Sequence, residues 1–433
     1  MRKIVKIDYG KNGLEFSINP SLNVTVFHPD AQKVLENPVK DIRKAIKNPL
    51  EGKPLQKIIE SKKKVEKVCV VVSDATRPVP THIILDGLIG ELNDYGIQDN
   101  QILILIATGL HRPSKTDEIE RIIGKHLIRR LKVKNHVATD TNSLQYFGNT
   151  EDNIPIYINK HYCSSDVKIT TGYVEPHFFF GFAGGRKSLV PGIAGKETIQ
   201  GNHSAKNIVS AYSRFGIYKE NVLHKNSMEI CETVGIDFTI NVCINENHEI
   251  VQVAAGDYKK VHETLVDYQH KYVFNEIQEP YDIVICGNGG YPLDLNLYQA
   301  VKSMAIGEIA VKKGGTIISV NECSDGIGAE KFKQLLFSGK SPEEIYSLIL
   351  NGEISVPDQW EIQILSRILM KAEIFVVSSL NEQELGNIGL KYAKTVEDAI
   401  NISLDKHGLQ AKILILPNGP QILPFLKYRK KKF

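Results

Sequence analysis

Short apolar runs alternate with amphipathic, helix-like segments along most of the chain. Residues 67–72 (KVCVVV) and 101–107 (QILILIA) are rich in β-branched and aliphatic residues, as is typical of buried strands. Residues 82–96 and 115–131, which follow these two runs, carry apolar residues at helical spacing. This order of strand, helix, strand and helix predicts an α/β fold.

The same rhythm continues and then restarts in the second half of the chain. Further strands are predicted at residues 166–172, 281–286, 314–320, 373–380 and 412–419. A helix is predicted from Tyr298 to Val311. The polar segment 275–280 (NEIQEP) lies at the restart, and 433 residues exceed what one core usually serves.

Two α/β domains are therefore predicted. The first covers residues 1–275 and the second covers residues 280–410. The last predicted strand could instead return to the first domain, together with the rest of residues 411–433.

Composition and charge exclude several classes of protein. Hydrophobic residues make up 42% of the chain and the formal net charge is +3, so neither nucleic acid nor an anionic membrane is an expected partner. The first residues lack the apolar region of a signal peptide, and no run reaches the roughly 18 apolar residues of a membrane span. We expect a cytoplasmic protein with buried thiols, and a solvated end at 427–433 (KYRKKKF).

Loops that follow strands carry the candidate chemistry, because ligands of open α/β sheets bind beyond the carboxyl ends of the strands. Four such loops contain glycine or proline beside ionisable or hydroxyl groups: SDATRP, ATGLHRP, GYVEPHFFFGFAGGRKS and GNGGYPLDLNLYQAVK. We expect them to form one shared site.

Neither common nucleotide fingerprint is present. No GxGxxG follows a strand and no GxxxxGK[ST] occurs, which disfavours an ordinary NAD or ATP enzyme. The glycines beside Arg186, Lys187 and Ser188 could still cradle a phosphate through backbone amides and a cation.

Three histidines differ from the rest because they lie in glycine- or proline-punctuated loops or at the start of a helix. These are His111, His177 and His203, and their spacing is not that of a zinc motif. The other histidines considered are expected to be structural: His126, His136, His161, His224, His248, His262, His270 and His407.

Five segments in this order resemble the lactate racemase family, whose members use a nickel-pincer nucleotide: SDATRP, GLHRP, EPHFFFGFAGGRKSLVPGIAG, GNHS and NGGYPLDLNLYQAVK. The resemblance extends over nearly the whole chain. It implies two α/β domains with the active site in the cleft between them. It also implies a racemase of a small 2-hydroxy acid, with D- and L-lactate as the first choice.

The resemblance also implies the roles of four residues. Lys187 would attach covalently to the cofactor, a nickel(II) pyridinium-3,5-bisthiocarboxylic acid mononucleotide, and His203 would bind its nickel. His111 and His177 would be the acid/base pair. Proteins that synthesise the cofactor and insert nickel would be needed for the holo form.

Further residues follow from the same resemblance and from their chemistry. Substrate would contact Arg77, Tyr298, Gln299 and Lys302, because a carboxylate needs fixed cations. The cofactor would contact Ser73, Asp74, Thr76, Arg77 and Ser188. Phe178, Phe179 and Phe180 are expected to form walls, and Trp360 is expected in the core.

The reaction explains why two bases are useful. Removing the Cα proton of a 2-hydroxy acid gives a very unfavourable carbanion beside a carboxylate, whereas hydride removal gives a flat 2-keto acid. A pyridinium-type acceptor supplies that chemistry, and imidazoles can exchange the hydroxyl proton near neutral pH.

Three alternatives remain open at this stage. The substrate could be malate, an aryl-lactate or an aldonate in place of lactate. The chain could be an NAD-dependent 2-hydroxy acid oxidoreductase, which would consume NAD. It could also bind nickel or a nucleotide without catalysis, which the presence of both His111 and His177 disfavours.

Overall fold

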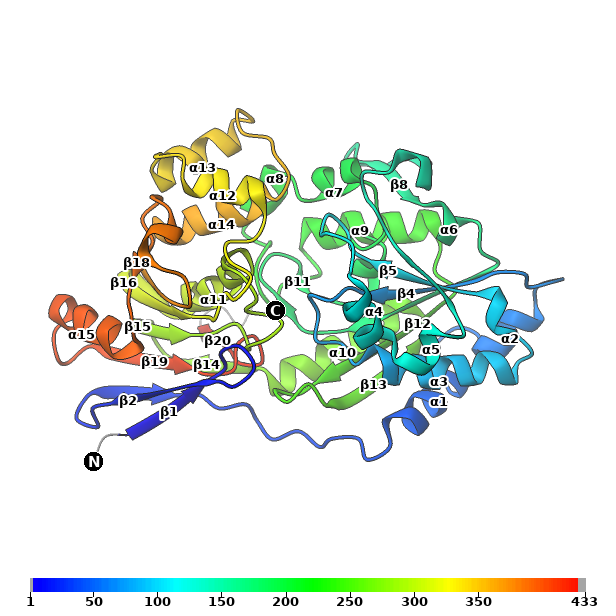
Figure 1. The fold of residues 1–433 in the computed structure, drawn as a ribbon, viewed down its shortest axis with the longest axis horizontal. Coiled ribbons are helices and arrows are strands. Elements are labelled where there is room, and N and C mark those ends of the chain that lie inside the picture. The colour runs from blue at the N-terminus through cyan, green and yellow to red at the C-terminus, as the bar shows by residue number, and fades with distance from the viewer. Residues whose placement is uncertain (1–2, 427–433) are drawn as a thin grey trace. The chain divides into compact units, whose positions relative to one another are not determined.

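The computed structural model describes residues 3–426 and divides the chain into two compact units (Figure 1). One unit comprises residues 31–271, and the other combines residues 1–30 with residues 272–433. Each unit contains a six-stranded sheet with helices, which confirms the predicted α/β class. The C-terminal segment 427–433, expected to be a solvated end, lies outside the described residues.

The sheet of residues 31–271 has the strand order β13-β12-β9-β4-β5-β6. Its strands, in that order, are Ile250–Gly256, Phe238–Ile244, Val167–Tyr173, Val68–Ser73, Ile102–Ala107 and Lys132–Asn135. All neighbours pair in parallel except β13, which runs antiparallel to β12. The central strands are almost entirely buried, as expected for a parallel sheet covered on both faces.

Helices lie on both sides of this sheet, with α1 and α3 on one side and α9 on the other (Figure 1). The α-helices of this unit are α1 (Pro38–Lys47), α2 (Leu55–Glu60), α3 (Thr81–Asp94), α4 (Thr116–Ile123), α5 (Lys125–Ile128), α6 (Lys160–Cys163), α7 (Lys196–Asn202), α8 (Ala205–Val209), α9 (Val222–Val234) and α10 (Tyr258–Tyr272). Val68, Val70 and Val72 of β4 share one buried core with Ile84 and Leu88 of α3. This alternation is the period of two that a strand requires.

The register of the central strands places their carboxyl ends level. Ser73, the last residue of β4, pairs with Ala107, the last residue of β5. On the other side of β4, Val71 pairs with Thr170 of β9. The loops that follow these three strands therefore begin at one edge of the sheet, as the sequence predicted.

The sheet of the other unit has the order β18-β17-β16-β15-β19-β3, with parallel pairing throughout. Its strands are Lys391–Tyr392, Glu373–Val377, Val311–Val320, Tyr281–Cys286, Lys412–Leu416 and Asn23–Val26. The α-helices of this unit are α11 (Leu297–Ala310), α12 (Glu330–Leu336), α13 (Pro342–Leu350), α14 (Gln359–Leu369) and α15 (Val396–His407). A hairpin of β1 (Lys3–Ile7) and β2 (Leu14–Ile18) shares a core with α15.

The predicted domain boundaries are wrong at both ends of the chain. Residues 1–30 belong to the second unit because β3 adds to the edge of its sheet beside β19. The described part of 411–433 stays in that unit. Its strand β20 (Leu423–Leu426) pairs with β14 (Phe274–Ile277), a strand in the segment predicted to be an interruption.

The helix predicted over residues 115–131 is also interrupted. Gly124 ends α4 with φ of +89°, a conformation that L-residues with side chains rarely adopt, and α5 begins directly after it. The apolar spacing continues across the break, so periodicity alone did not reveal it. No helix within residues 3–426 combines the length and apolar character needed to cross a bilayer.

Candidate functional site

Asp74 and His111 form a hydrogen-bonded pair beyond the ends of β4 and β5. The Nδ1 atom of His111 lies 2.7 Å from Oδ2 of Asp74. The other carboxylate oxygen accepts a hydrogen bond of 2.8 Å from the Thr76 hydroxyl. Because a carboxylate accepts hydrogen bonds, Nδ1 of His111 carries the hydrogen, and in the neutral ring Nε2 keeps a lone pair.

The environment of Asp74 favours its charged form. Burial by itself raises the pKa of this carboxyl group, but the charge and hydrogen bond of His111, the charge of Arg77 and the Thr76 hydroxyl bring it below its usual value. The side chain of His111 is 31% exposed while that of Asp74 is 6% exposed. The pair is thus a buried anion that orients a histidine still open to solvent.

His177 is held by the backbone of its own turn. It lies in β10 (Pro176–His177), which pairs with β11 (Gly181–Phe182), so His177 faces Gly181 across a tight hairpin. Its Nδ1 accepts from the backbone N–H of Phe180 at 3.3 Å and of Phe179 at 3.5 Å. In the neutral ring the hydrogen therefore lies on Nε2, the reverse of the arrangement at His111.

His203 is buried and neutral. It ends α7, and its Nδ1 lies 3.1 Å from the backbone oxygen of Ile199. Burial, with a further contribution from the positive charge of Lys187, lowers the pKa of His203 to about 3. Since Nδ1 donates to the carbonyl, Nε2 retains a lone pair that can bind a metal.

Two phenylalanines, Phe179 and Phe180, lie between His177, Lys187 and His203. Lys187 lies in a short 3-10 helix, η3 (Gly185–Ser188), with Nζ 4.3 Å from the ring centre of Phe180. The ring centre of His203 is 5.4 Å from that of Phe180 and 5.2 Å from that of Phe179. The ring of His177 lies 4.6 Å from Phe179 and 5.8 Å from Phe180.

The hydroxyl groups of Ser73 and Ser188 both lie near Gly172. A Cβ atom placed on Gly172 would lie 4.0 Å from the Ser73 hydroxyl oxygen and 3.9 Å from that of Ser188. The Ser188 hydroxyl donates to the backbone oxygen of Thr171 at 3.1 Å. Because anionic phosphate oxygens accept hydrogen bonds, this hydroxyl would have to leave Thr171 before donating to a phosphate.

The suggestion that Arg186 binds phosphate is wrong. Its side chain is completely buried, and its terminal nitrogens donate to backbone oxygens and to His262. Arg186 therefore binds groups in the interior of the protein and is not available to a phosphate.

The donor set fits a metal that receives most of its ligands from a cofactor. Among residues 3–426 no group of three or more His, Cys, Asp or Glu side chains is placed to hold a metal ion. His203 nevertheless offers a neutral imidazole beside Lys187 and two aromatic rings. One protein ligand of this kind suits a metal that takes its other ligands from a bound group.

The other predicted substrate residues lie at the start of α11. The side chain of Lys302 donates to the amide oxygen of Gln299, and the hydroxyl of Tyr298 lies 3.1 Å from Oδ1 of Asp358. The indole N–H of Trp360 donates to the same hydroxyl at 3.2 Å. Burial, with Asp358 and Glu361 nearby, raises the pKa of Tyr298 well above its ordinary value.

Sequence reasoning missed Asp358 and gave Trp360 only a core role. Trp360 is buried, as predicted, but it also fixes the hydroxyl of Tyr298. Asp358 precedes α14 and has a positive φ of 63°. No spacing rule connects these residues to Tyr298, so only the fold reveals the contact.

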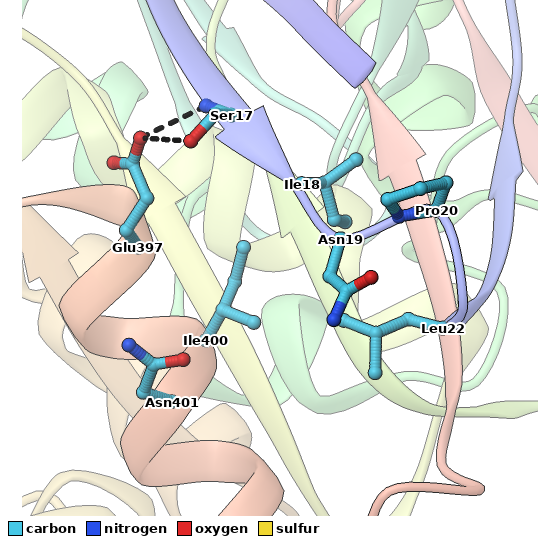
Figure 2. A pocket seen from close by; sticks show the side chains of 8 residues that line it. All are labelled: Ser17, Ile18, Asn19, Pro20, Leu22, Glu397, Ile400 and Asn401. Carbon is cyan, nitrogen blue, oxygen red and sulfur yellow. Dashed lines mark hydrogen bonds between the residues drawn. The ribbon is translucent and has the colours of Figure 1, made fainter. Parts of the chain in front are cut away.

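A pocket of about 550 Å³ in the same unit contains none of the predicted site residues. It is lined by Ser17, Ile18, Asn19, Pro20, Leu22, Glu397, Ile400 and Asn401 (Figure 2). Its carboxylate, Glu397, accepts hydrogen bonds from the backbone N–H and the hydroxyl of Ser17 at 2.8 and 3.2 Å. These contacts join the β1–β2 hairpin to α15. They give the Glu397 carboxylate a structural role, so no ligand is needed to account for it.

The Asp74–His111 pair predicts a pH-dependent contribution to stability. A carboxyl group whose folded pKa is depressed stabilises the fold fully above its unfolded pKa of about 3.9 and loses that contribution as pH falls through the folded pKa. We expect Asp74→Asn to lower the free energy of unfolding by on the order of 1–3 kcal/mol at pH 6, because buried partners lose an acceptor. Urea unfolding should show this difference shrinking below about pH 4.

Asp86→Asn is the matched control, because Asp86 makes a 2.6 Å pair with His126 that is far more exposed. This variant should change stability by less than about 1 kcal/mol. A difference for Asp74→Asn that stays constant from pH 6 to pH 3 would contradict the assignment.

Comparisons with known proteins identify the family of this chain. Residues 9–216 match the family model of the lactate racemase N-terminal domain, and residues 277–423 match that of the lactate racemase C-terminal domain. Lactate racemase from Thermoanaerobacterium thermosaccharolyticum is 34% identical over 97% of this chain and 98% of its own length. Lactate racemase from Lactiplantibacillus plantarum is 36% identical over 87% of this chain and 89% of its own length.

Solved structures give the same result. The lactate racemase apoprotein from T. thermosaccharolyticum superimposes with a TM-score of 0.89 at 32% identity, covering 98% of this chain and all of the other. A protein from Thermotoga maritima has a TM-score of 0.71 over 92% of this chain and all of its own, and at 20% identity it shows the fold alone. The chain therefore belongs to the lactate racemase family of isomerases.

Proposed function

We propose that this chain interconverts D- and L-lactate with a nickel-pincer pyridinium mononucleotide attached to Lys187. Family membership supports the reaction class, and the gathering of His177, Lys187 and His203 around Phe179 and Phe180 is the observation that carries the proposal. Both relatives are lactate racemases, which favours lactate over malate, aryl-lactates and aldonates.

The residues near Lys187 fit the proposed cofactor. When bound, this group supplies a hydride acceptor, which is the chemistry needed to pass through a flat 2-keto acid. Lys187 would hold it covalently, and the lone pair on His203 would bind its nickel. The buried aromatic rings of Phe179 and Phe180 would keep water away from the reacting carbon.

Residues at the end of β4 would hold the nucleotide portion and the substrate carboxylate. The hydroxyls of Ser73 and Ser188 lie near Gly172 and would contact the phosphate or ribose once Ser188 releases the backbone oxygen of Thr171. The Thr76 hydroxyl is held by Asp74. Arg77 would supply a planar cation for a carboxylate. Asp74, predicted to bind ribose, already uses both oxygens on protein groups, so we propose that its main task is to orient His111.

The two acid/base histidines have complementary hydrogen-bonding states. The Asp74 carboxylate leaves a lone pair on Nε2 of His111, which can accept a proton, whereas the backbone N–H groups of Phe179 and Phe180 keep the hydrogen of neutral His177 on Nε2, where it can donate a hydrogen bond. To give up a proton, a histidine must first be an imidazolium ion. One imidazole can thus take the proton of a substrate hydroxyl while the other returns a proton after inversion. A turnover would leave the first ring as imidazolium and the second ring neutral, which is the starting state for the reverse reaction.

The residues at the start of α11 would complete substrate binding. Lys302 and Gln299 are joined by a hydrogen bond, and Tyr298 is fixed by Asp358 and Trp360. Such preorganised side chains suit a small anion whose carboxylate must be held while the second carbon inverts. We propose that Tyr298, Gln299 and Lys302 contact the lactate carboxylate or its methyl group.

The attachment of the cofactor can be tested directly. Protein produced in cells that make the cofactor should carry a nucleotide-sized mass adduct on Lys187 and should racemise either lactate enantiomer without added NAD. Lys187→Ala should lose both the adduct and the activity, whereas Lys206→Ala, at an exposed position, should keep both. Intact-mass analysis and chiral chromatography measure the two results. An active enzyme with unmodified Lys187 would refute the proposal.

The complementary histidines predict opposite half-reactions. His111→Ala and His177→Ala should each stop net racemisation, because every turnover needs both rings, with a loss of about 10²- to 10⁴-fold for a removed base. Single-turnover absorbance changes should nevertheless show that the two variants prefer opposite lactate enantiomers. His126→Ala, at an exposed histidine, should behave as wild type. The same enantiomer preference in both catalytic variants would contradict the assigned roles.

A further inference from the structure

Among the described residues, Arg186 is the largest side chain that is fully buried. The proposed function assigns it no role. It lies in η3 directly before Lys187. A buried cation is costly unless it is hydrogen-bonded, so its partners indicate what it does. The two terminal nitrogens of Arg186 make hydrogen bonds, whereas its Nε has no partner among the described residues.

The guanidinium group binds the loop that leads to Lys187. One terminal nitrogen donates to the backbone oxygens of Phe180 and Phe182 at 3.1 and 2.9 Å. The other donates to the backbone oxygens of Gly184 at 3.2 Å and Ala183 at 3.5 Å. A single side chain thus ties four carbonyl groups between the catalytic hairpin and Lys187.

His262 joins this loop to α10. Its Nε2 lies 2.7 Å from a terminal nitrogen of Arg186 and 3.1 Å from the backbone oxygen of Ala183. Because a guanidinium group only donates, the shorter contact makes Nε2 an acceptor, and the contact with Ala183 is then not a hydrogen bond. Burial, together with the charge of Arg186, lowers the pKa of His262 well below its ordinary value, which agrees with a neutral ring. The ring also packs against Gly185, where an added Cβ would approach its atoms to 3.2 Å.

No carboxylate compensates the charge of Arg186 within residues 3–426. The groups that influence it are burial, which lowers its pKa to about 9, and Cys231 and Tyr218, which raise it. The guanidinium therefore remains a cation at neutral pH, and neutral oxygens stabilise it. Hydrogen bonds to a charged group are stronger than neutral ones, which makes this arrangement stiffer than a neutral turn.

We call Arg186, His262 and the four carbonyl groups bound by Arg186 the clamp. Phe180 connects this clamp to the site. Its backbone oxygen is bound by Arg186, and its ring centre lies 5.5 Å from the guanidinium carbon. The same ring contacts Lys187 at 4.3 Å, His203 at 5.4 Å and His177 at 5.8 Å. A shift of Phe180 would therefore disturb three groups at once.

We propose that Arg186 is a positioning residue that, with His262, fixes Phe180 and so sets the placement of Lys187, His177 and His203. The inference rests on the proposed role of Lys187. Misplacement of reacting groups by about 1 Å can cost on the order of 100-fold in rate, so the clamp matters even though Arg186 does not touch substrate.

Arg186→Lys tests the proposal in the full-length protein, because lysine keeps the charge but loses the planar fork. Arg214→Lys is the matched control. Arg214 also donates to three backbone oxygens, those of Ile208, Ser210 and Ser213, but none of them belongs to the loop before Lys187. Hydrogen exchange of residues 177–187 is measured on protein without cofactor. Then kcat for lactate is calculated per molecule that carries the mass adduct, and KM for lactate is measured in the same assay.

We expect Arg186→Lys to accelerate exchange in residues 177–187 and to lower kcat by about 10- to 100-fold with little change in KM. Arg214→Lys should alter neither exchange in that segment nor kcat. Wild-type exchange and wild-type kcat in Arg186→Lys would overturn the inference. If wild-type enzyme is active with unmodified Lys187, the proposed function fails instead, and the exchange result still decides the clamp.

A second pair of variants decides the question if Arg186→Lys does not fold. His262→Leu removes the acceptor for Arg186, whereas His262→Gln offers an amide oxygen in its place. We expect faster exchange in residues 177–187 for His262→Leu and recovery towards wild type for His262→Gln. Equal exchange in the two variants would overturn the role of the clamp.

Discussion

The buried parallel sheet of residues 31–271 determines where this protein can place polar chemistry. Backbone groups of its central strands are used within the sheet and both faces are covered, so reactive side chains are accommodated where the strands end. Because β4 and β5 end at paired residues, Ser73 and Ala107, the side chains of Asp74 and His111 form a hydrogen bond although 37 positions separate them in the sequence. The hairpin after β9 brings His177 to the same edge.

Different neighbours give chemically identical side chains different tasks at this edge. A carboxylate makes His111 a donor at Nδ1, and backbone N–H groups make His177 an acceptor at Nδ1. His203 donates from Nδ1 to a backbone carbonyl, and burial with the charge of Lys187 keeps it neutral. The rings therefore differ in which nitrogen is available. Under the proposed function, these differences would let a metal ligand lie beside two acid/base groups at one site.

Strand and helix periodicity predicted the fold class and the loops that carry the site, because both depend on local apolar spacing. It could not predict that β3 joins β19, since that pairing links residues almost 400 positions apart. Motif resemblance named Lys187 and the three histidines. It did not reveal that Asp74 binds His111 or that Arg186 turns inward, because each depends on which partner the folded chain brings within hydrogen-bonding distance.

The fate of the Cα hydrogen tests most directly whether His111 and His177 handle only the hydroxyl proton. L-lactate carrying deuterium at Cα should be converted by the holoenzyme in ordinary water into D-lactate that retains the deuterium, as mass spectrometry of the separated enantiomer would show. Retention is expected because imidazole protons exchange with solvent, whereas a hydrogen that never reaches an imidazole does not. Replacement of most of the deuterium by solvent hydrogen would contradict the account, because it would mean that a histidine removes the Cα proton itself.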